Sequence, residues 1–522
     1  MYYKSSSTDN NEKDKVVTLE IRHNSFRIYP YKLAKYDKET GRNTGTCPKL
    51  DRAFTNFDYF RKRWKLKLNI YNKATKSLVL PIGVGIDFIK EKLDENYVFY
   101  NIIDNSDTYV KPREISVNLY DKTVIRDRFQ AESIDFLTSK SLLHAKMLAL
   151  YTGRGKTFCA ISAIYRLKEA ALIISPTLAD QWCEKISEYT NCNIDNGGIV
   201  MIRGTEKLHK VLNKPREKHR AVFYISTSST LSKYIENYGT LNEIGERLGI
   251  GIKCFDEFHM YYSQNVSIDC NLETEFTFYL TATPDRTDYN EKKIFKNLFH
   301  KIPVYGLETF KIDNYFNIRC VDYDTNPTEY EIQKCMTEKG FSGILYWNYI
   351  FNNPERKMYM IGMLKMLIDQ LLEKDPDIKV LIYLAKLEHI KEFKRILESI
   401  YDNSGLKFGN YTTAVKKENK RREIKNNIIF TTLGSGSVGL DVDKLIASFS
   451  LVPFSSNITA SQAMGRVRKI ENDEVYYYDF VDKGFKSMDT QREKRMMIFK
   501  VKSKTITKKF ISYDDIKRYL FN

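Results

Sequence analysis

Two segments of the chain carry residue types suited to phosphate chemistry. The first, Thr152-Gly153-Arg154-Gly155-Lys156-Thr157, follows the apolar run KMLALY and precedes the helical pattern FCAISAIYRL. In such a loop glycines let backbone N–H groups surround phosphates, and the N-terminus of the following helix attracts negative charge. We expect Lys156 to reach the β and γ phosphates and Thr157 to hold Mg²⁺. Leu150 stands where the usual pattern has a small residue.

The second segment is an acidic pair. Asp256-Glu257-Phe258-His259 ends the apolar run IKCF, at the carboxyl end of a predicted strand, where ligands bind in open parallel sheets. Asp256 is suited to organising Mg²⁺ and Glu257 to polarising an attacking water. Taken alone, such a pair is an ordinary solvated loop; together with the loop at 152–157, it predicts a nucleotide site.

Three weaker segments follow the acidic pair. LTATP (280–284) places hydroxyl residues at a strand end, where they can link the acidic site to a neighbouring domain, although TAT also suits an ordinary strand end. NIIFTTLGSGSVGLDVD (427–443) delivers Thr432 and then a glycine-rich turn with Gly439 and Asp441, which also suits a plain loop. In SQAMGRVRK (461–469), Gln462 and Arg466 are expected to share one helical face, and the basic residues can stabilise charge on a transferring phosphoryl group. The alternative is a solvated basic helix.

The elements that must position these residues alternate between apolar strands and amphipathic helices. The first series of strand patterns is KMLALYT, ALIISP, GIVMIR, AVFYIST, IKCFDEF and FTFYLTAT, and the second is KVLIYLA, NIIFTT, IASFSLVP and VYYYDFVD. Short, nearly continuous apolar runs favour parallel strands covered by helices on both faces. The sequence therefore predicts two α/β domains in tandem, preceded by a small α+β domain with the runs VVTLEIR, FRIYPY, KLKLNIY and SLVLPIG.

These patterns divide the 522 residues into six parts. We predict a disordered tail at 1–15, an N-terminal accessory domain at 16–118, a first α/β domain at 119–325, a linker at 326–345, a second α/β domain at 346–490 and a basic C-terminal extension at 491–522. The extension includes a polar, tail-like stretch, SKTITKKF.

Composition narrows the class of partner. A formal net charge of +17 indicates an anionic partner, most often nucleic acid. The accessory domain carries Arg61, Arg63 and Trp64 in one short basic segment, which reads as a nucleic-acid contact or as a solvated strand face. No stretch resembles a membrane span or a signal peptide, so we expect a non-secreted, intracellular protein without a membrane partner. The eight cysteines form no C-x-x-C pair, which disfavours zinc.

The ordered set TGRGKT, SPTLADQW, DEFH, LTATP, TTLGSGSVGLD and QAMGRVRK resembles superfamily 2 helicases. The resemblance covers roughly residues 124–482 and is strongest to the viral and phage branch, which includes poxviral transcript-release and phage branch-migration helicases. It implies two RecA-like domains, ATP and Mg²⁺ as cofactors, and DNA as the expected partner, with RNA or an RNA–DNA hybrid as alternatives. It also implies contacts with replication, recombination or transcription machinery, a monomer, and the host cytoplasm as the location.

Site residues carry over from this resemblance position by position. Phe129 and Gln130 are similar to the element that reads adenine, although Asp127 stands where an arginine is common. The implied nucleic-acid contacts are Pro176, Thr177, Gln181, Trp182, Thr227, Ser228 and Thr432. The nucleotide contacts are Thr152, Gly153, Arg154, Gly155, Lys156, Thr157, Gly439, Asp441 and Gln462, and the catalytic set is Lys156, Asp256, Glu257, Arg466 and Arg468, with Lys469 at the expected position of the last arginine. The implied activity is an ATP-dependent helicase or translocase; the alternatives are a double-strand translocase or transcript-release factor and a non-catalytic scaffold.

Overall fold

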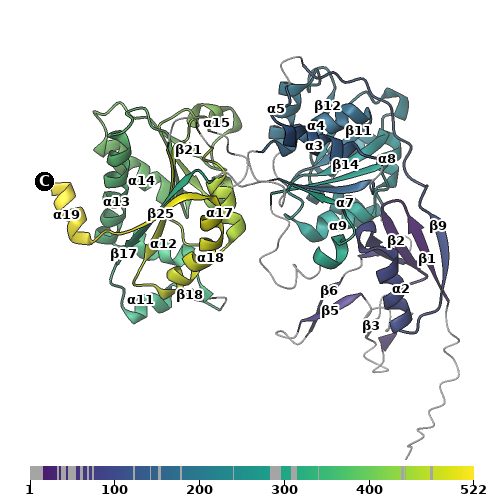
Figure 1. Ribbon diagram of the computed structural model, residues 1–522, viewed down its shortest axis with the longest axis horizontal. Helices are drawn as coiled ribbons and strands as arrows, with labels where there is room; N and C mark the ends of the chain where they lie inside the picture. The colour runs from purple at the N-terminus through teal and green to yellow at the C-terminus, as the bar shows by residue number, and fades with distance from the viewer. Residues whose placement is uncertain are drawn as a thin grey trace, which may run out of the picture. The chain divides into compact units, whose positions relative to one another are not determined.

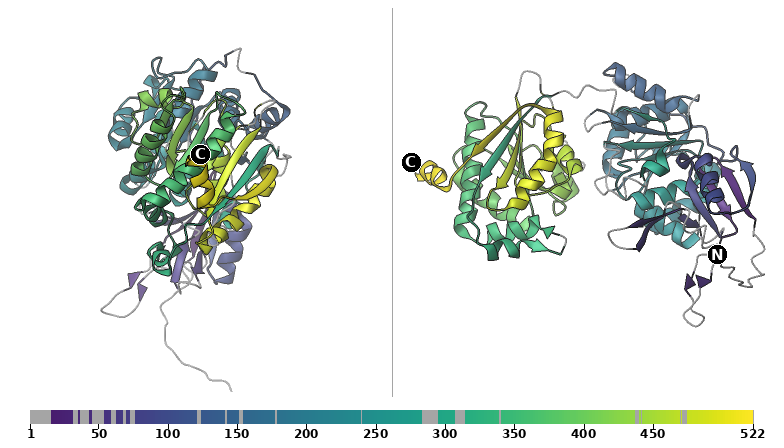
Figure 2. Two further views of the ribbon diagram at one scale, coloured as in Figure 1. Left: turned by 90° about the vertical axis from the view of Figure 1, so that its left-hand side faces the viewer. Right: turned by 60° about the horizontal axis from the view of Figure 1, so that its bottom comes forward.

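The computed structural model divides into two compact units, residues 1–309 and 310–522. It describes residues 16–31, 35–36, 43–44, 54–58, 63–67, 70–72, 76–120, 124–140, 143–150, 154–176, 179–238, 240–282, 295–306, 314–338, 340–436, 440, 442–468, 470 and 474–521. The predicted tail at 1–15 lies outside these residues. Figures 1 and 2 show each unit as a twisted sheet with helices on both faces.

The first unit begins with a small α+β domain, as predicted. Its described strands form one sheet in the order β7 (Ile70–Asn72), β8 (Ser77–Pro81), β2 (Ser25–Tyr29), β1 (Val17–Arg22) and β9 (Tyr100–Asn105), with helix α2 (Ile86–Glu95). Two hairpins accompany it, β3 (Lys35–Tyr36) with β4 (Asn43–Thr44) and β5 (Thr55–Asp58) with β6 (Arg63–Lys67). Leu19, Ile28 and Leu80 on its inner face are fully buried.

This small domain is joined to the rest of its unit by buried hydrogen bonds. The Asn24 amide and the Ser25 hydroxyl donate to the two carboxylate oxygens of Glu273, at 2.7 and 2.8 Å. The buried apolar residues of both parts also form one continuous core. The accessory domain therefore packs as part of the first unit rather than as a separate body.

The larger sheet of the first unit is parallel. In chain order its described strands are β10 (Ala145–Ala149), β11 (Ala170–Ile174), β12 (Ile199–Ile202), β13 (Phe223–Ser226), β14 (Ile250–Phe255), β15 (Phe276–Thr281) and β16 (Val304–Tyr305), and in space they lie in the order β12-β13-β11-β14-β15-β10-β16. The helices are α3 (Arg128–Thr138), α4 (Lys156–Leu167), α5 (Ala179–Tyr189), α6 (Gly204–Leu212), α7 (Ser228–Tyr238), α8 (Asn242–Leu248) and α9 (Tyr262–Cys270). Helices α3, α4 and α5 cover one face, and α7 and α9 cover the other (Figure 1).

The second unit repeats this design. Its described strands are β17 (Phe316–Tyr323), β20 (Val380–Leu384), β21 (Phe408–Tyr411), β22 (Ile428–Thr432), β23 (Ala447–Ser450), β24 (Val475–Asp482) and β25 (Ser503–Phe510), parallel and in the order β21-β22-β20-β23-β24-β17-β25. Its helices are α11 (Glu329–Lys334), α12 (Gly343–Phe351), α13 (Pro354–Leu372), α14 (Leu387–Ile400), α15 (Lys417–Glu423), α16 (Leu433–Gly436), α17 (Asn457–Met464), α18 (Lys486–Lys502) and α19 (Tyr513–Phe521), and a short hairpin joins β18 (Met336–Thr337) to β19 (Gly340–Phe341). The predicted fold class, two tandem RecA-like parallel sheets after a small α+β domain, is confirmed.

The boundaries differ from the predicted ones at both ends of the second unit. Strand β17 was assigned to the first domain by its position before residue 325, yet it pairs with β24 and β25. The predicted linker at 326–345 contains α11, β18, β19 and the start of α12. The stretch SKTITKKF is not a tail but strand β25, whose side chains after Ser503 are exposed because it is the edge strand of the sheet.

Candidate active site

The predicted phosphate-binding loop ends at a glycine whose backbone requires left-handed geometry. Gly155 caps α4 with φ +86°, and a Cβ there would lie 2.6 Å from the side-chain nitrogen of Gln130. The first turn of α4 contains no acidic residue. Its amide groups therefore form a positive helix end that suits an anion.

Lys156 begins α4 and is 9% exposed. Its ammonium group donates to the carbonyl of Leu150 at 3.0 Å and lies 3.7 Å from Oε1 of Glu257. The structure thus brings together the lysine and the glutamate that were predicted as catalytic residues 101 positions apart. Leu150, which departs from the usual loop pattern, contributes its carbonyl group to this contact.

Gln130 lies against the same loop because α3 begins just before it. Asp127 is the N-cap of α3, and its carboxylate accepts from the Gln130 amide at 2.9 Å. The Gln130 side-chain oxygen accepts from the amide of Arg126, also at 2.9 Å. Asp127 therefore has a structural role that an arginine would not fulfil, and the role of Gln130 in reading adenine stays a prediction.

The acidic pair follows β14 directly. Asp256 is 8% exposed, and its Oδ2 accepts a hydrogen bond of 2.8 Å from the indole nitrogen of Trp182. Burial, and then the charge of Glu257, raise the pKa of Asp256 to about 6, while the hydrogen bond from Trp182 opposes that rise. Glu257 has φ +43°, a left-handed conformation that is uncommon for residues with a side chain and that often marks functional sites.

His259 connects this acidic loop to the neighbouring strand. Its Nδ1 lies 3.0 Å from the hydroxyl of Thr281, at the end of β15, and 3.3 Å from Oε2 of Glu257. The LTATP segment was expected to link the acidic site to a neighbouring domain. Its Thr281 hydroxyl instead contacts His259 within the first unit. Thr283 and Pro284 lie outside the described residues.

The predicted nucleic-acid contacts of the first unit occupy different environments. Thr227 is partly exposed at the carboxyl end of β13, but Ser228 is 2% exposed, and its hydroxyl donates to Oδ1 of Asn265 at 2.7 Å. Pro176 is partly exposed at the end of β11, and Trp182 is buried with its donor on Asp256. Ser228 and Trp182 are therefore inside the domain rather than on a binding surface.

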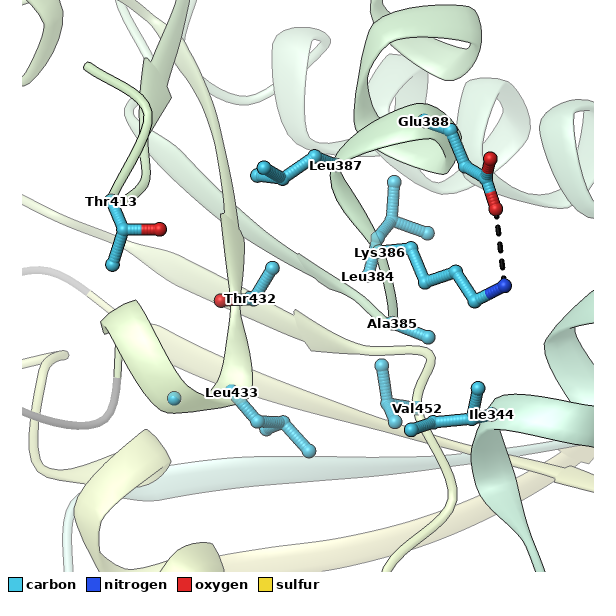
Figure 3. Close-up of a pocket in the computed structure, with 11 residues that line it drawn as sticks. Ile344, Leu384, Ala385, Lys386, Leu387, Glu388, Thr413, Thr432, Leu433 and Val452 are labelled. Atoms are coloured by element: carbon cyan, nitrogen blue, oxygen red, sulfur yellow. Dashed lines mark hydrogen bonds and ion pairs between the residues drawn. The ribbon is translucent and has the colours of Figure 1, made fainter.

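In the second unit, Thr432 ends β22 beside a pocket of about 780 Å³. Figure 3 shows this pocket lined also by Thr413, Lys386 and Glu388, with Lys386 and Glu388 paired at 3.1 Å, and by the apolar side chains Ile344, Leu384, Leu387, Leu433 and Val452. The carboxyl ends of β20 and β22 meet here, which places Thr432 where a parallel sheet binds ligands.

The predicted basic helix is shorter than expected. Helix α17 ends at Met464 with Gly465 as its C-cap, so Gln462 is in the helix and Arg466 is in the turn after it. The expectation that both share one helical face is wrong, because the helix stops between them. The Arg466 guanidinium instead donates to the carbonyl of Leu440 at 2.8 Å, which joins this turn to the glycine-rich segment.

The remaining predicted site residues have simple placements. Arg154, Thr157 and Phe129 are partly exposed, Gln462 is buried, and Arg468 is exposed. Arg63 and Trp64 lie on β6. Outside the described residues lie Arg61, Thr152, Gly153, Thr177, Gly439, Asp441 and Lys469.

Two hydrogen bonds at this site carried no usable signal in the sequence. The Trp182 bond to Asp256 and the Asn265 bond to Ser228 join segments separated by 74 and 37 positions. Asp127 did carry a signal, because an acidic residue just before an amphipathic pattern is a common N-cap.

The structure has two parallel sheets in tandem, with the predicted phosphate loop and acidic pair at the carboxyl edge of the first, and this architecture is that of tandem RecA-like domains. Comparison with known proteins finds helicase and translocase relatives. A family model described as type III restriction enzyme, res subunit, matches residues 114–286. The DNA 3'-5' translocase XPB2 of Sulfurisphaera tokodaii is 31% identical over 175 residues, which are 32% of this chain and 33% of the relative. The chain thus matches about a third of the length of that relative.

Solved structures agree with the fold. Mss116p bound to single-stranded RNA and AMP-PNP superposes with a TM-score of 0.52 at 15% identity, covering 75% of each chain. T4 UvsW covers 95% of this chain and 100% of its own at 16% identity, with a TM-score of 0.35. A score that low does not decide membership of the phage branch, which stays a prediction. No helix among the described residues is long and apolar enough to cross a membrane.

Proposed function

We propose that the protein is an ATP-dependent nucleic-acid helicase or translocase of superfamily 2, which hydrolyses ATP to move along or remodel DNA. One observation carries the proposal. Lys156, at the N-terminus of α4, lies 3.7 Å from Glu257, and Asp256 lies next to it at the carboxyl edge of the same parallel sheet. A lysine on a positive helix end and two carboxylates are the donor set that a magnesium nucleotide requires.

Each functional residue of the first unit has a separate role in this proposal. Lys156 and the amides of α4 bind the phosphates, and Thr157 and Asp256 hold Mg²⁺, which neutralises charge on the phosphates when bound. The Glu257 carboxylate accepts the proton of the attacking water, and Gln130, beside Gly155, orients the adenine.

The second unit supplies the groups that complete hydrolysis. Gln462, Arg466 and Arg468 contact the nucleotide, and the arginines stabilise charge on the transferring phosphoryl group. Thr432 and Thr227 hold the nucleic-acid backbone at the carboxyl edges of the two sheets, so binding depends weakly on sequence.

DNA is the favoured substrate. The formal net charge of +17 suits a polyanion, and the similar protein of Sulfurisphaera tokodaii is described as a DNA translocase. Since that relative is described as a translocase, the second candidate is translocation on DNA without strand separation. A strand-displacement assay run beside a triplex-displacement assay distinguishes them: a helicase separates forked strands, whereas a duplex translocase displaces only the third strand.

The test is ATP hydrolysis measured with single-stranded DNA, duplex DNA, forked DNA and an RNA–DNA hybrid. We expect at least one polynucleotide to raise the rate, and Lys156→Ala to abolish hydrolysis while the variant remains folded and binds the same polynucleotide. Retained turnover in Lys156→Ala contradicts the phosphate-site assignment. A folded wild-type protein that binds DNA but never hydrolyses ATP supports the non-catalytic scaffold instead.

A further inference from the structure

Asn265 fills a buried position between two predicted functional segments. It lies on α9, is 2% exposed, and uses its side-chain amide in three hydrogen bonds. Its Oδ1 accepts from the Ser228 hydroxyl at 2.7 Å, and its Nδ2 donates to the carbonyls of Phe258 at 3.1 Å and Met260 at 2.7 Å. Both amide protons face carbonyl oxygens, so only this orientation of the amide satisfies all partners.

The two carbonyls belong to the acidic loop. Phe258 and Met260 follow Glu257, and the Met260 amide donates to the Glu257 carbonyl at 2.7 Å, which closes a tight turn. Glu257 occupies a left-handed conformation in this turn, and such a conformation persists only where surrounding contacts hold it. The bonds from Asn265 hold the turn from the side of α7 and α9.

Ser228 is the first residue of α7 and directly follows Thr227, at the carboxyl end of β13. Because Ser228 is buried and its hydroxyl points to Asn265, that hydroxyl is not available to a bound strand. The hydrogen bonds of Ser228 and Asn265 therefore connect the position next to Thr227 with the acidic loop.

We propose that Asn265 is a positioning residue that couples binding of a nucleic-acid strand at Thr227 to the orientation of Glu257. This inference rests on the proposed function. In this proposal Ser228 transmits the effect of strand binding and does not itself contact the strand. Asn265 touches neither the nucleotide nor the strand.

The test compares three single variants of the full chain and the double variant of Asn265→Leu with Ser228→Ala. Asn265→Leu keeps the size of the side chain and removes its hydrogen bonds, and Ser228→Ala removes only the link to α7. Asn271→Leu is the matched control, because Asn271 is an equally buried asparagine at the end of the same helix and donates to the carbonyl of Ser267. The measurements are kcat and KM for ATP with and without (dT)30, a (rU)30 and a 30-base-pair duplex, and the Kd for each by fluorescence anisotropy.

We expect Asn265→Leu to lower the ratio of stimulated to basal kcat at least tenfold, with the Kd and the KM within about threefold of wild type. Ser228→Ala should lower the same ratio, the double variant should lower it no further than Asn265→Leu alone, and Asn271→Leu should keep it. The inference is overturned if Asn265→Leu or Ser228→Ala keeps the wild-type ratio, which includes an equal fall in basal and stimulated rates. A wild-type protein that no polynucleotide stimulates overturns the proposed function as well, so the two failures are distinguishable.

Discussion

Replacing Trp182 with Phe removes one hydrogen-bond donor from a buried carboxylate. The indole nitrogen lies 2.8 Å from Oδ2 of Asp256, and Trp182 is 1% exposed. Burial and the charge of Glu257 raise the pKa of Asp256 from 3.8 to about 6, and the indole limits this rise because it stabilises the ionised form. The variant therefore tests whether Trp182 keeps Asp256 charged.

The size of the effect follows from the charge on the acceptor. A hydrogen bond to a charged group contributes ~1.5–3 kcal/mol, and one pKa unit corresponds to about 1.4 kcal/mol. The pKa of Asp256 should therefore rise by roughly 1–2 units more in Trp182→Phe. Since the folded pKa is already above the unfolded value, folding binds the proton more tightly, and stability falls as pH rises from the unfolded to the folded pKa. In the variant this fall continues to higher pH.

The assay is urea unfolding followed by circular dichroism at about pH 5 and pH 8.5, with EDTA present to keep divalent cations off the carboxylate. The loss of ring volume in Trp182→Phe destabilises the protein equally at both pH values. The lost hydrogen bond should lower the free energy of unfolding by a further ~1.5–3 kcal/mol at pH 8.5 only, where Asp256 is ionised.

Trp347→Phe provides the control. Trp347 is also buried, but its indole donates to an uncharged acceptor, the carbonyl of Leu451, at 3.2 Å. The decrease in the free energy of unfolding caused by Trp347→Phe should therefore be the same at pH 5 and pH 8.5. A penalty for Trp182→Phe that is the same at pH 5 and pH 8.5 refutes the reasoning, because it means that the indole does not stabilise the ionised form of Asp256.

Two further predictions concern the phosphate site. Glu257→Gln should bind ATP with an affinity near that of wild type and lower kcat at least 100-fold, since it removes the base and keeps the shape; normal turnover in a steady-state assay removes Glu257 from that role. Gly155→Ala should weaken ATP binding roughly 5- to 30-fold, because left-handed geometry costs an L-residue about 1–2 kcal/mol, and the new Cβ would also meet Gln130. Titration with a fluorescent ATP analogue measures the effect, and unchanged affinity shows that the loop does not need the glycine.

The parts of the fold that sequence predicts well are those where burial leaves a continuous signal. All five residues of β11 and all six of β14 are buried, so their runs read as strands covered on both faces. The phosphate loop was predictable for the same reason, since its glycines stand between such a strand and a helix.

The boundaries of the second unit were harder to predict from the sequence because β17 contains buried polar residues. Asn317 and Asp322 are almost fully buried, and Asp322 is paired with Arg492 from α18. That pairing is 170 positions apart, so the pattern before residue 325 gives no indication of which sheet the strand joins. Strand β25 was read as a tail because an edge strand with exposed side chains lacks the apolar run that marks an inner strand.

The order of strands in the large sheet of the first unit explains why the end of β13 is connected to the acidic loop through an intermediate residue. Strand β14, which delivers Asp256 and Glu257, lies between β11 and β15. Trp182 follows β11 and Thr281 ends β15, so both contact the acidic loop directly, at Asp256 and His259.

Strand β13 is one position further from β14, beyond β11. A side chain at its end cannot contact the loop across the intervening strand, and Ser228 instead meets Asn265, which extends from α9 to the carbonyls of Phe258 and Met260. Three strand ends are thus connected to one acidic loop, two directly and one through a relay. A nucleic-acid strand that contacts Thr227 at this edge of the sheet is connected to the turn of Glu257 through Ser228 and Asn265, and the rate of hydrolysis should therefore respond to its binding.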